Sequence, residues 1–200
     1  MKEIVLATGN AHKVKEIDAI LKTLGITVVP QSKYRVSEVP ETGTTFVENA
    51  IIKARNAAQQ TGLPAIADDS GIEVDVLHGE PGVYSSRFSA PYADDLKNLD
   101  KLINCIRPYP LEQRTARYWC IMVFMRHAKD PTPIICQASW EGLLLTEKRG
   151  QNGFGYDPIF LIPELQKTAA EISLNEKNSM SHRAKAIDLL LKRLAEIYKK

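Results

Sequence analysis

The sequence predicts an α/β fold, in which helices flank a β-sheet. Strand-like apolar runs alternate with helical patterns through the first 70 residues, two longer β-rich runs follow, and an amphipathic helix closes the chain. With 200 residues, of which 44% are hydrophobic, the chain is long enough for one well-buried core and too short to require two independent domains. We therefore expect a single domain over residues 1–200.

The first five elements follow from hydrophobic periodicity. Residues 4–7 form a short apolar run, which predicts a strand. Apolar side chains recur at helical spacing over residues 12–24, which predict a helix. Residues 26–29 and 65–67 predict strands, and residues 45–60 predict the helix between them. This alternating order favours a sheet covered by helices over a bundle or a sandwich.

The second half of the chain has longer elements. Residues 116–125 and 134–145 are rich in β-formers, and the polar, proline-containing loop 126–133 joins them. They predict an antiparallel pair. Residues 181–199 carry apolar side chains in a stripe with a period of 3.6 residues, which predicts a helix that packs on the sheet.

Charge and cysteine content narrow the classes of function. The 26 basic and 24 acidic residues are spread along the chain, so nucleic acid is not an expected partner. The three cysteines lack CxxC spacing, which argues against a disulfide framework or a zinc site. No signal-like segment opens the chain, and no apolar run approaches the length of a membrane span. We expect a soluble, cytoplasmic protein.

A polar turn follows the first predicted strand. Thr8-Gly9-Asn10-Ala11-His12-Lys13 joins this strand to the first predicted helix. Free backbone N–H groups and the helix dipole favour an anion there, Gly9 permits close approach, and Lys13 adds positive charge. The turn is neither a Walker A loop nor a Rossmann fingerprint, so it indicates either a phosphate site or an ordinary helix-capping turn.

Two adjacent carboxylates are the strongest chemical indication in the chain. Asp68 and Asp69 directly follow the apolar run 65–67, where their mutual repulsion calls for a compensating cation. Mg²⁺ prefers oxygen ligands and combines one or two carboxylates with substrate phosphates. The other interpretation is an Asx turn that ends the strand. By themselves, Glu41 and Lys53 are typical of a solvated loop acid and a surface lysine.

Two further clusters lie near the end of the chain. The glycine-rich loop 150–158 presents Phe154 for stacking on a base, although Phe154 and Tyr156 in a turn before a strand are also typical of core residues. Lys177 precedes Ser181-His182-Arg183, in which Ser181 is a credible N-cap and two cations occupy the first helical turn. A ligand anion or carbonyl group would explain this placement, as would simple exposure to solvent.

Taken together, these motifs resemble those of the inosine triphosphate pyrophosphatase family over nearly the whole chain. The motifs are Thr8-Gly9-Asn10-Ala11-His12-Lys13, Glu41-Thr42-Gly43, Phe46-Val47-Glu48-Asn49-Ala50 with Lys53-Ala54, Ala67-Asp68-Asp69-Ser70-Gly71, Pro81-Gly82-Val83-Tyr84-Ser85-Ser86-Arg87, Gly153-Phe154-Gly155-Tyr156-Asp157-Pro158 and Ser181-His182-Arg183. The resemblance implies an elongated mixed β-sheet flanked by helices, two lobes with a central nucleotide-binding cleft, and a homodimer.

The resemblance also implies an activity and a set of site residues. The implied reaction is the hydrolysis of ITP, dITP and XTP to the nucleoside monophosphate and pyrophosphate, with Mg²⁺ held by Glu41 and Asp69. Asp69 is the implied proton acceptor, and orienting the attacking water is its chemically safer role. The implied substrate-binding residues are Thr8, Gly9, Asn10, Ala11, His12, Lys13, Lys53, Ser70, Phe154, Gly155, Tyr156, Asp157, Lys177, His182 and Arg183.

The base pocket implied by the resemblance also accounts for selectivity among purines. Hypoxanthine and xanthine present O6 as an acceptor where adenine presents an amino donor, so Arg183 or a protonated His182 would disfavour adenine. The main alternative is a nucleotide-binding regulator without turnover. A second is an enzyme of the same fold that acts on modified pyrimidine or ordinary nucleotides. The presence of Asp69, Glu41, Lys13 and Lys53 favours the enzyme over the non-catalytic regulator.

Overall fold

The computed structural model describes residues 2–8, 14, 17, 21, 22, 25–91 and 93–198. Its strands form a seven-stranded sheet in the order β2-β1-β3-β4-β5-β6-β7. The sheet is mixed, because β1 pairs in parallel with β2 and β3, whereas β6 pairs in antiparallel with β5 and β7. The predicted α/β class with a mixed sheet is confirmed. Most of the predicted helix over residues 12–24 lies outside the described residues.

The chain divides into two compact units. The first unit consists of Met1–Asp69, Cys120–Gln137 and Ala186–Lys200, and the second of Ser70–Trp119 and Ala138–Lys185. No helix within the described part of the chain combines the length and the apolar character that crossing a membrane requires.

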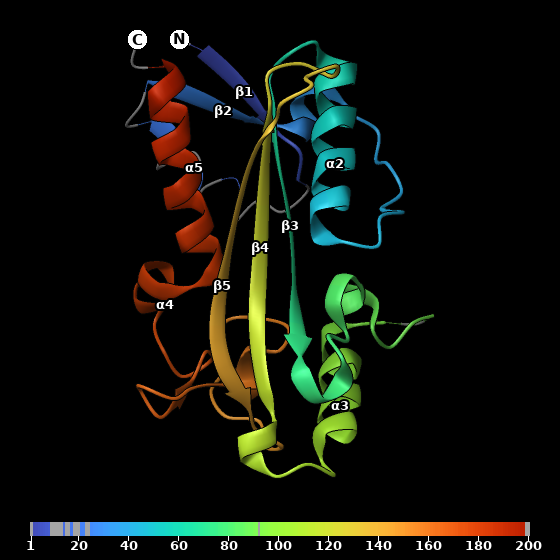
Figure 1. Ribbon diagram of the computed structural model, residues 1–200, viewed down its shortest axis with the longest axis vertical. Coiled ribbons are helices and arrows are strands. Elements are labelled where there is room, and N and C mark those ends of the chain that lie inside the picture. The colour runs from blue at the N-terminus through green and yellow to red at the C-terminus, as the bar shows by residue number, and fades with distance from the viewer. Residues whose placement is uncertain are drawn as a thin grey trace. The chain divides into compact units, whose positions relative to one another are not determined.

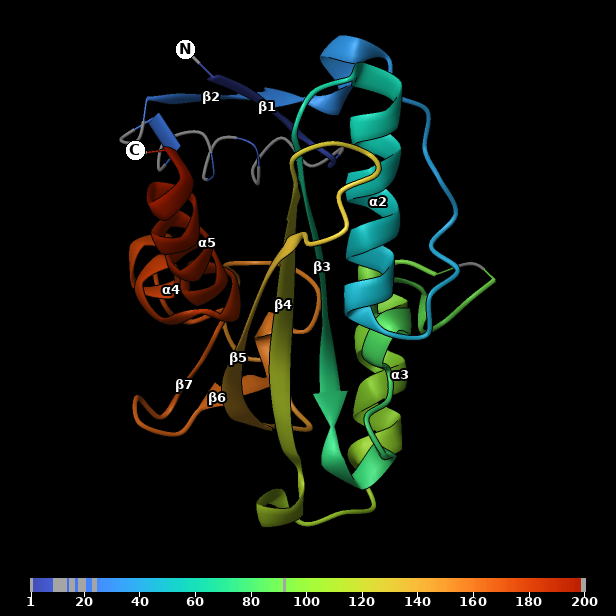
Figure 2. The same ribbon diagram turned by 45° about the horizontal axis from the view of Figure 1, so that its top comes forward.

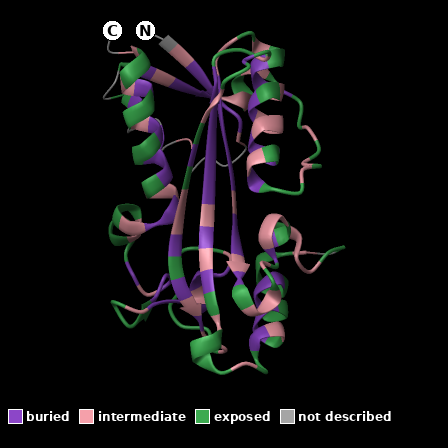
Figure 3. Ribbon diagram, in the orientation of Figure 1, coloured by how far each residue is buried: buried purple, intermediate pink, exposed green. Residues whose placement is uncertain are grey.

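In the first unit, the early elements confirm three predictions. Strand β1 (Lys2–Leu6) pairs with β2 (Ile26–Pro30) in a register that sets Ile4 opposite Val28. Helix α2 (Phe46–Thr61) lies beside the first residues of β3 in Figures 1 and 2. Its boundaries follow from local chemistry, because Thr45 and Glu48 form a capping box and Gly62 ends the helix with φ +69°. Figure 3 shows the buried and exposed sides of this helix.

Strand β3 corrects the prediction for residues 65–67. It runs from Ala65 to Val74, so Asp68 and Asp69 lie within the strand and the Asx-turn interpretation is wrong. Ile72 and Val74 are fully buried, and their alternating burial extends the strand beyond the two carboxylates. Neighbouring strands β1 and β4 provide backbone partners, which a reading of local periodicity does not detect.

The predicted long strands and the last helix are present. Strands β4 (Thr115–Met125) and β5 (Ile134–Leu144) are neighbours in the sheet. Helix α5 spans His182–Tyr198, and the part of it from Ala186 onwards belongs to the first unit. One face of this part is buried. Its buried side chains there are Ala186, Ile187, Leu190 and Leu194.

The second unit contains elements that the sequence patterns did not predict. They are α3 (Asp95–Ile106), β7 (Lys167–Thr168) and α4 (Leu174–Met180), whereas β6 (Phe160–Ile162) is the strand that the core interpretation of the glycine-rich loop placed after it. Short 3-10 turns of this unit occupy Asp75–Leu77, Gly82–Arg87, Leu111–Gln113 and Asp157–Ile159, and another occupies Gln31–Tyr34 in the first unit. The core of this unit joins Leu102 and Ile106 of α3 to Ile72 and Val74 of β3. Figure 2 shows β6 and β7 next to the end of β5.

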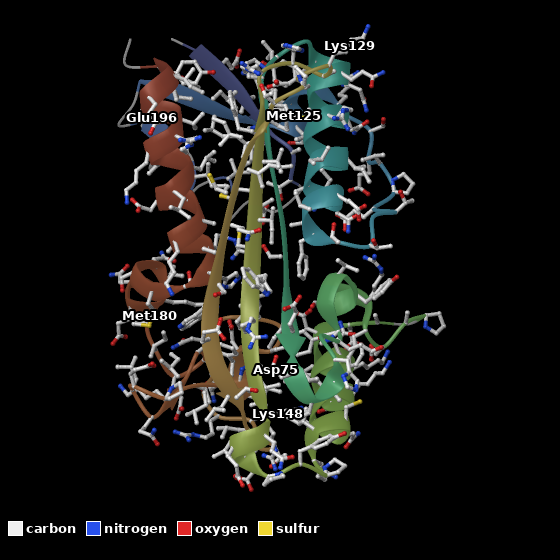
Figure 4. The ribbon with its side chains drawn as sticks, viewed as in Figure 1. Asp75, Met125, Lys129, Lys148, Met180 and Glu196 are labelled. Atoms are coloured by element: carbon white, nitrogen blue, oxygen red, sulfur yellow. The ribbon has the colours of Figure 1, made fainter. Side chains whose placement is uncertain are left out.

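A charged cluster follows β3 in the second unit. Asp75, labelled at the end of this strand in Figure 4, accepts two hydrogen bonds from Arg117, at 2.7 and 2.9 Å. Arg117 also donates to Glu141 at 2.9 Å. Hydrogen bonds from Arg117 and Thr115 lower the pKa of Asp75. Arg117 is hydrogen-bonded to both acids, so we interpret the cluster as a structural contact that links neighbouring segments of the sheet.

Candidate active site

One residue of the predicted phosphate turn is described, and the others are not. Thr8 is half-buried, and its N–H donates to the Leu6 carbonyl at 2.9 Å, just beyond the end of β1. The predicted site residues Gly9, Asn10, Ala11, His12 and Lys13 lie outside the described residues.

In the first unit, Lys53 contacts both predicted metal-binding carboxylates. Its Nζ lies 2.9 Å from Glu41 Oε1 and 2.9 Å from Asp69 Oδ1. The side chains of Lys53, Glu41 and Asp69 retain 19%, 31% and 12% of their exposure, so the triad is shielded but reachable from solvent. The interpretation of Lys53 as an ordinary surface lysine is therefore wrong. Two carboxylate oxygens converge on one cationic nitrogen.

The start of α2 positions this triad. The fully buried Asn49 accepts a 2.8 Å hydrogen bond from the backbone N–H of Gly43, two residues after Glu41. A Cβ on Gly43 would lie 2.6 Å from Glu48 Cβ, so only glycine allows this close approach. Lys53 then projects from the second turn of α2. Asn49 is a positioning residue that the sequence analysis did not single out, although it lies within a quoted motif.

Burial and charge act in opposite directions at the triad. Burial raises the pKa of Asp69, and the nearby Lys53 ammonium lowers it only partly, so the pKa remains above its usual value. Burial lowers the pKa of Lys53, but the charges of Asp69 and Asp68 and the hydrogen bond to Glu41 outweigh it and raise the pKa. The raised pKa keeps Lys53 protonated, so a cation lies between Glu41 and Asp69.

In the second unit, Asp157 organises the glycine-rich loop. This buried carboxylate accepts hydrogen bonds from the Phe154 backbone N–H at 2.9 Å and from Lys177 Nζ, both through Oδ2. A Cβ on Gly153, which has φ +76°, would lie 2.0 Å from that oxygen. Lys177 Nζ also lies 5.1 Å from the centre of the Phe154 ring. The structure thus joins three predicted base-pocket residues.

The two aromatic residues of this loop differ. Phe154 is 58% exposed, whereas Tyr156 is 5% exposed and belongs to the core of the unit. The Tyr156 hydroxyl donates to the Ser85 carbonyl at 2.7 Å. Phe154 also borders a cavity of about 250 Å³ lined by Asp95, Leu96, Leu99, Gln151, Asn152, Gly153, Phe154, Gly155 and Pro158. The core interpretation is therefore correct for Tyr156 and wrong for Phe154.

Helix α5 begins as predicted. The Ala184 N–H donates to Ser181 Oγ at 3.3 Å, which confirms Ser181 as an N-cap, and His182 and Arg183 occupy the first turn. His182 is buried, and its imidazole is stacked on the Tyr118 ring with centroids 4.9 Å apart. Arg183 and Ser70 are both half-buried.

Within the described part of the chain, no three or more His, Cys, Asp or Glu side chains are grouped so that they could hold a metal ion. Glu41 and Asp69 therefore provide two carboxylates, which by themselves do not fill the coordination shell of a metal ion. Such a pair suits a hard divalent cation only if other oxygen atoms complete its coordination.

Comparison with known proteins identifies the family. The Ham1 family model matches residues 4–193. The chain is 56% identical over 195 residues to the dITP/XTP pyrophosphatase of Vibrio parahaemolyticus, covering 98% of both chains. It is 58% identical to the dITP/XTP pyrophosphatase of Thioalkalivibrio sulfidiphilus, covering 96% of this chain and 98% of that one. A solved HAM1 protein from Coxiella burnetii superimposes with a TM-score of 0.94 at 47% identity, covering 98% and 100% of the two chains. The resemblance drawn from the motifs is confirmed, and the chain belongs to the Ham1 family.

Proposed function

We propose that this chain hydrolyses noncanonical purine nucleoside triphosphates, namely ITP, dITP and XTP, to the nucleoside monophosphate and pyrophosphate. Membership of the family, with near-full-length relatives named dITP/XTP pyrophosphatase, is the observation that carries this proposal. Such hydrolysis removes these nucleotides from the precursor pool before they enter DNA or RNA. In this reaction water attacks the α-phosphorus, and pyrophosphate is the leaving group.

The Lys53 triad fits the phosphate end of the reaction. Phosphoryl transfer depends mainly on positioning and charge neutralisation. In our proposal Lys53 exchanges its carboxylate partners for the phosphates of the incoming substrate, and Asp69 accepts a hydrogen bond from the attacking water. Lys53 then stabilises the negative charge of the leaving pyrophosphate. The 2.9 Å contacts of Lys53 with both acids support this assignment, because the exchange frees both carboxylates together.

Glu41 and Asp69 fit a divalent cation, which we propose to be Mg²⁺. Their contacts with the Lys53 ammonium support this proposal, because the same two oxygen donors already lie beside a positive charge. Mg²⁺ binds through one or two carboxylates together with waters and substrate phosphates, which matches two protein ligands. When bound, it would supply neutralisation of the phosphate charge.

The second-unit cluster fits the purine base. The exposed Phe154 ring offers a stacking surface, and the Asp157–Lys177 ion pair fixes the loop that carries it. His182 and Arg183 supply donors for the O6 acceptor of hypoxanthine or xanthine. Adenine would leave such donors opposite its own amino donor, which disfavours ATP.

Several finer features remain predictions of the same proposal. The triphosphate also contacts Thr8 and the segment from Gly9 to Lys13, and Ser70 contacts the substrate. The two units work as one catalytic domain, the protein acts as a homodimer, and its compartment is the cytoplasm.

The decisive experiment measures the products. Pyrophosphate and orthophosphate are assayed after incubation with ITP, XTP, dITP, GTP and ATP, with Mg²⁺ and with EDTA. We expect pyrophosphate from the first three substrates in the presence of Mg²⁺ only. Saturable ITP binding without any product would instead establish the non-catalytic regulator.

A further inference from the structure

Tyr118 is a buried residue of β4 that no motif in the sequence analysis included. It lies in the second unit, is 8% exposed, and contacts two separate parts of the proposed base pocket. Its hydroxyl group faces the glycine-rich loop, and its ring faces the start of α5. Neither contact involves the carboxylates of the first unit.

The hydroxyl contact bears on the loop. Tyr118 Oη donates to Asp157 Oδ1 at 3.3 Å, while Asp157 Oδ2 accepts from Lys177 and from the Phe154 N–H. The two oxygens of one carboxylate thus have different hydrogen-bond donors. Burial, reinforced by the Asp157 charge, raises the pKa of the Tyr118 phenol well above its usual value, so the hydroxyl keeps its proton and remains a donor.

The ring contact bears on the helix. The Tyr118 and His182 rings are stacked, with 4.9 Å between centroids and 13° between planes. Phe160 packs against Tyr118 with a centroid distance of 4.7 Å, and Phe160 is fully buried. Close packing against Phe160 restricts the rotation of the Tyr118 ring, so the ring provides a fixed surface for the imidazole.

We propose that Tyr118 is a positioning residue for base recognition, which orients Asp157 through its hydroxyl group and His182 through its ring. The proposal rests on the proposed function, since it assigns Tyr118 a part in selecting the purine. One strand residue thereby sets the geometry of two base-pocket side chains, an acceptor and a donor, that come from two distant segments of the chain. Selectivity for a purine with an O6 acceptor requires this fixed geometry. A misplaced donor weakens the discrimination between purine bases before it weakens binding of the triphosphate.

Two substitutions separate the two contacts. Tyr118→Phe keeps the ring and removes the hydroxyl group, whereas Tyr118→Leu removes both. We expect Tyr118→Phe to raise KM for ITP about tenfold and to change kcat less than about twofold, because one hydrogen bond to a charged group is lost away from the reacting phosphate. The ratio of kcat/KM for ITP to that for ATP should fall by a similar factor.

A measurement on the free protein tests the ring contact without any substrate. The Cε1–H resonance of His182, assigned by its disappearance in His182→Gln, should carry a ring-current shift from the stacked phenol. Trp140 is also stacked on His182, with 6.4 Å between centroids, and contributes to the shift in every variant. We expect Tyr118→Phe to keep the wild-type shift and Tyr118→Leu to lose the part that the closer Tyr118 ring contributes. A wild-type shift in Tyr118→Leu would overturn the proposed positioning of His182.

The control separates positioning from stability. Leu102→Ala opens the same hydrophobic core from α3 and should lower the melting temperature without changing KM or the ITP-to-ATP ratio. The proposal is wrong if Tyr118→Phe keeps the wild-type KM and ratio, or if Leu102→Ala reproduces its changes. Wild-type protein that releases no pyrophosphate from any triphosphate would refute the proposed function instead, and the His182 resonance would still decide the ring contact.

Discussion

Replacing Lys53 by methionine should tighten the binding of a divalent cation to the substrate-free protein. Lys53 now contributes a hydrogen bond to Glu41 and another to Asp69, each at 2.9 Å. A metal ion that binds the same two carboxylates must displace the ammonium. Methionine keeps most of the length and apolar volume of the side chain and removes the competing charge.

The size of the effect follows from those two contacts. A hydrogen bond between charged groups contributes about 1.5–3 kcal/mol, and partial exposure of Glu41 and Asp69 places them at the lower end, near 1.5 kcal/mol. Losing one such competitor tightens the metal Kd about tenfold, and losing both tightens it about 100-fold. Catalysis should fall in the same variant, because Lys53 no longer stabilises the phosphates.

The assay is titration of free protein with Mn²⁺, followed by electron paramagnetic resonance and calorimetry at pH 8. Lys33→Met is the matched control, since Lys33 is a 64% exposed lysine of the same unit that lies 3.7 Å from Glu3. We expect its Mn²⁺ affinity to equal that of the wild type. Weaker or unchanged Mn²⁺ binding by Lys53→Met would refute the competition between ammonium and metal.

Three further predictions concern the other charged groups. Asp69→Asn should lower kcat for ITP by at least about 100-fold while far-ultraviolet circular dichroism stays unchanged, and wild-type kinetics would remove Asp69 from the mechanism. Arg183→Ala should reduce the preference for ITP over ATP in kcat/KM, whereas equal losses for both would indicate a phosphate or structural role. Asp130→Asn should lower the free energy of unfolding at pH 7 by about 1–3 kcal/mol, because Arg126 hydrogen bonds hold the pKa of Asp130 far below its usual value. That wild-type advantage is fully present above the unfolded pKa of about 4 and is lost as pH falls through the lower folded pKa, so the difference between the two proteins in urea titrations should shrink progressively below about pH 4.

Elements with strong local signals were predictable. Helix α2 has a capping box and a terminal glycine, and α5 carries its apolar stripe, so their ends agree with the predictions to within about a residue. The length of β3 was not predictable, since its backbone bonds depend on strands distant in the chain. Helix α3 was missed, although Asp94 caps it and Leu99, Leu102 and Ile106 bury one face.

By itself, the sequence determined the α/β class, the family and the residue types that carry the chemistry, because motif order and hydrophobic periodicity are properties of the linear chain. Only the tertiary structure decided that Lys53 lies between Glu41 and Asp69, although Asp69 follows Lys53 by 16 residues in the sequence. It alone also placed Tyr118 against Asp157, 39 residues away. Strand pairing and core packing make such contacts, because each side chain meets the neighbour that its face of the helix or strand packs against. The spacing of residues along the sequence predicts the face of a side chain, but it does not predict which distant segment packs against that face.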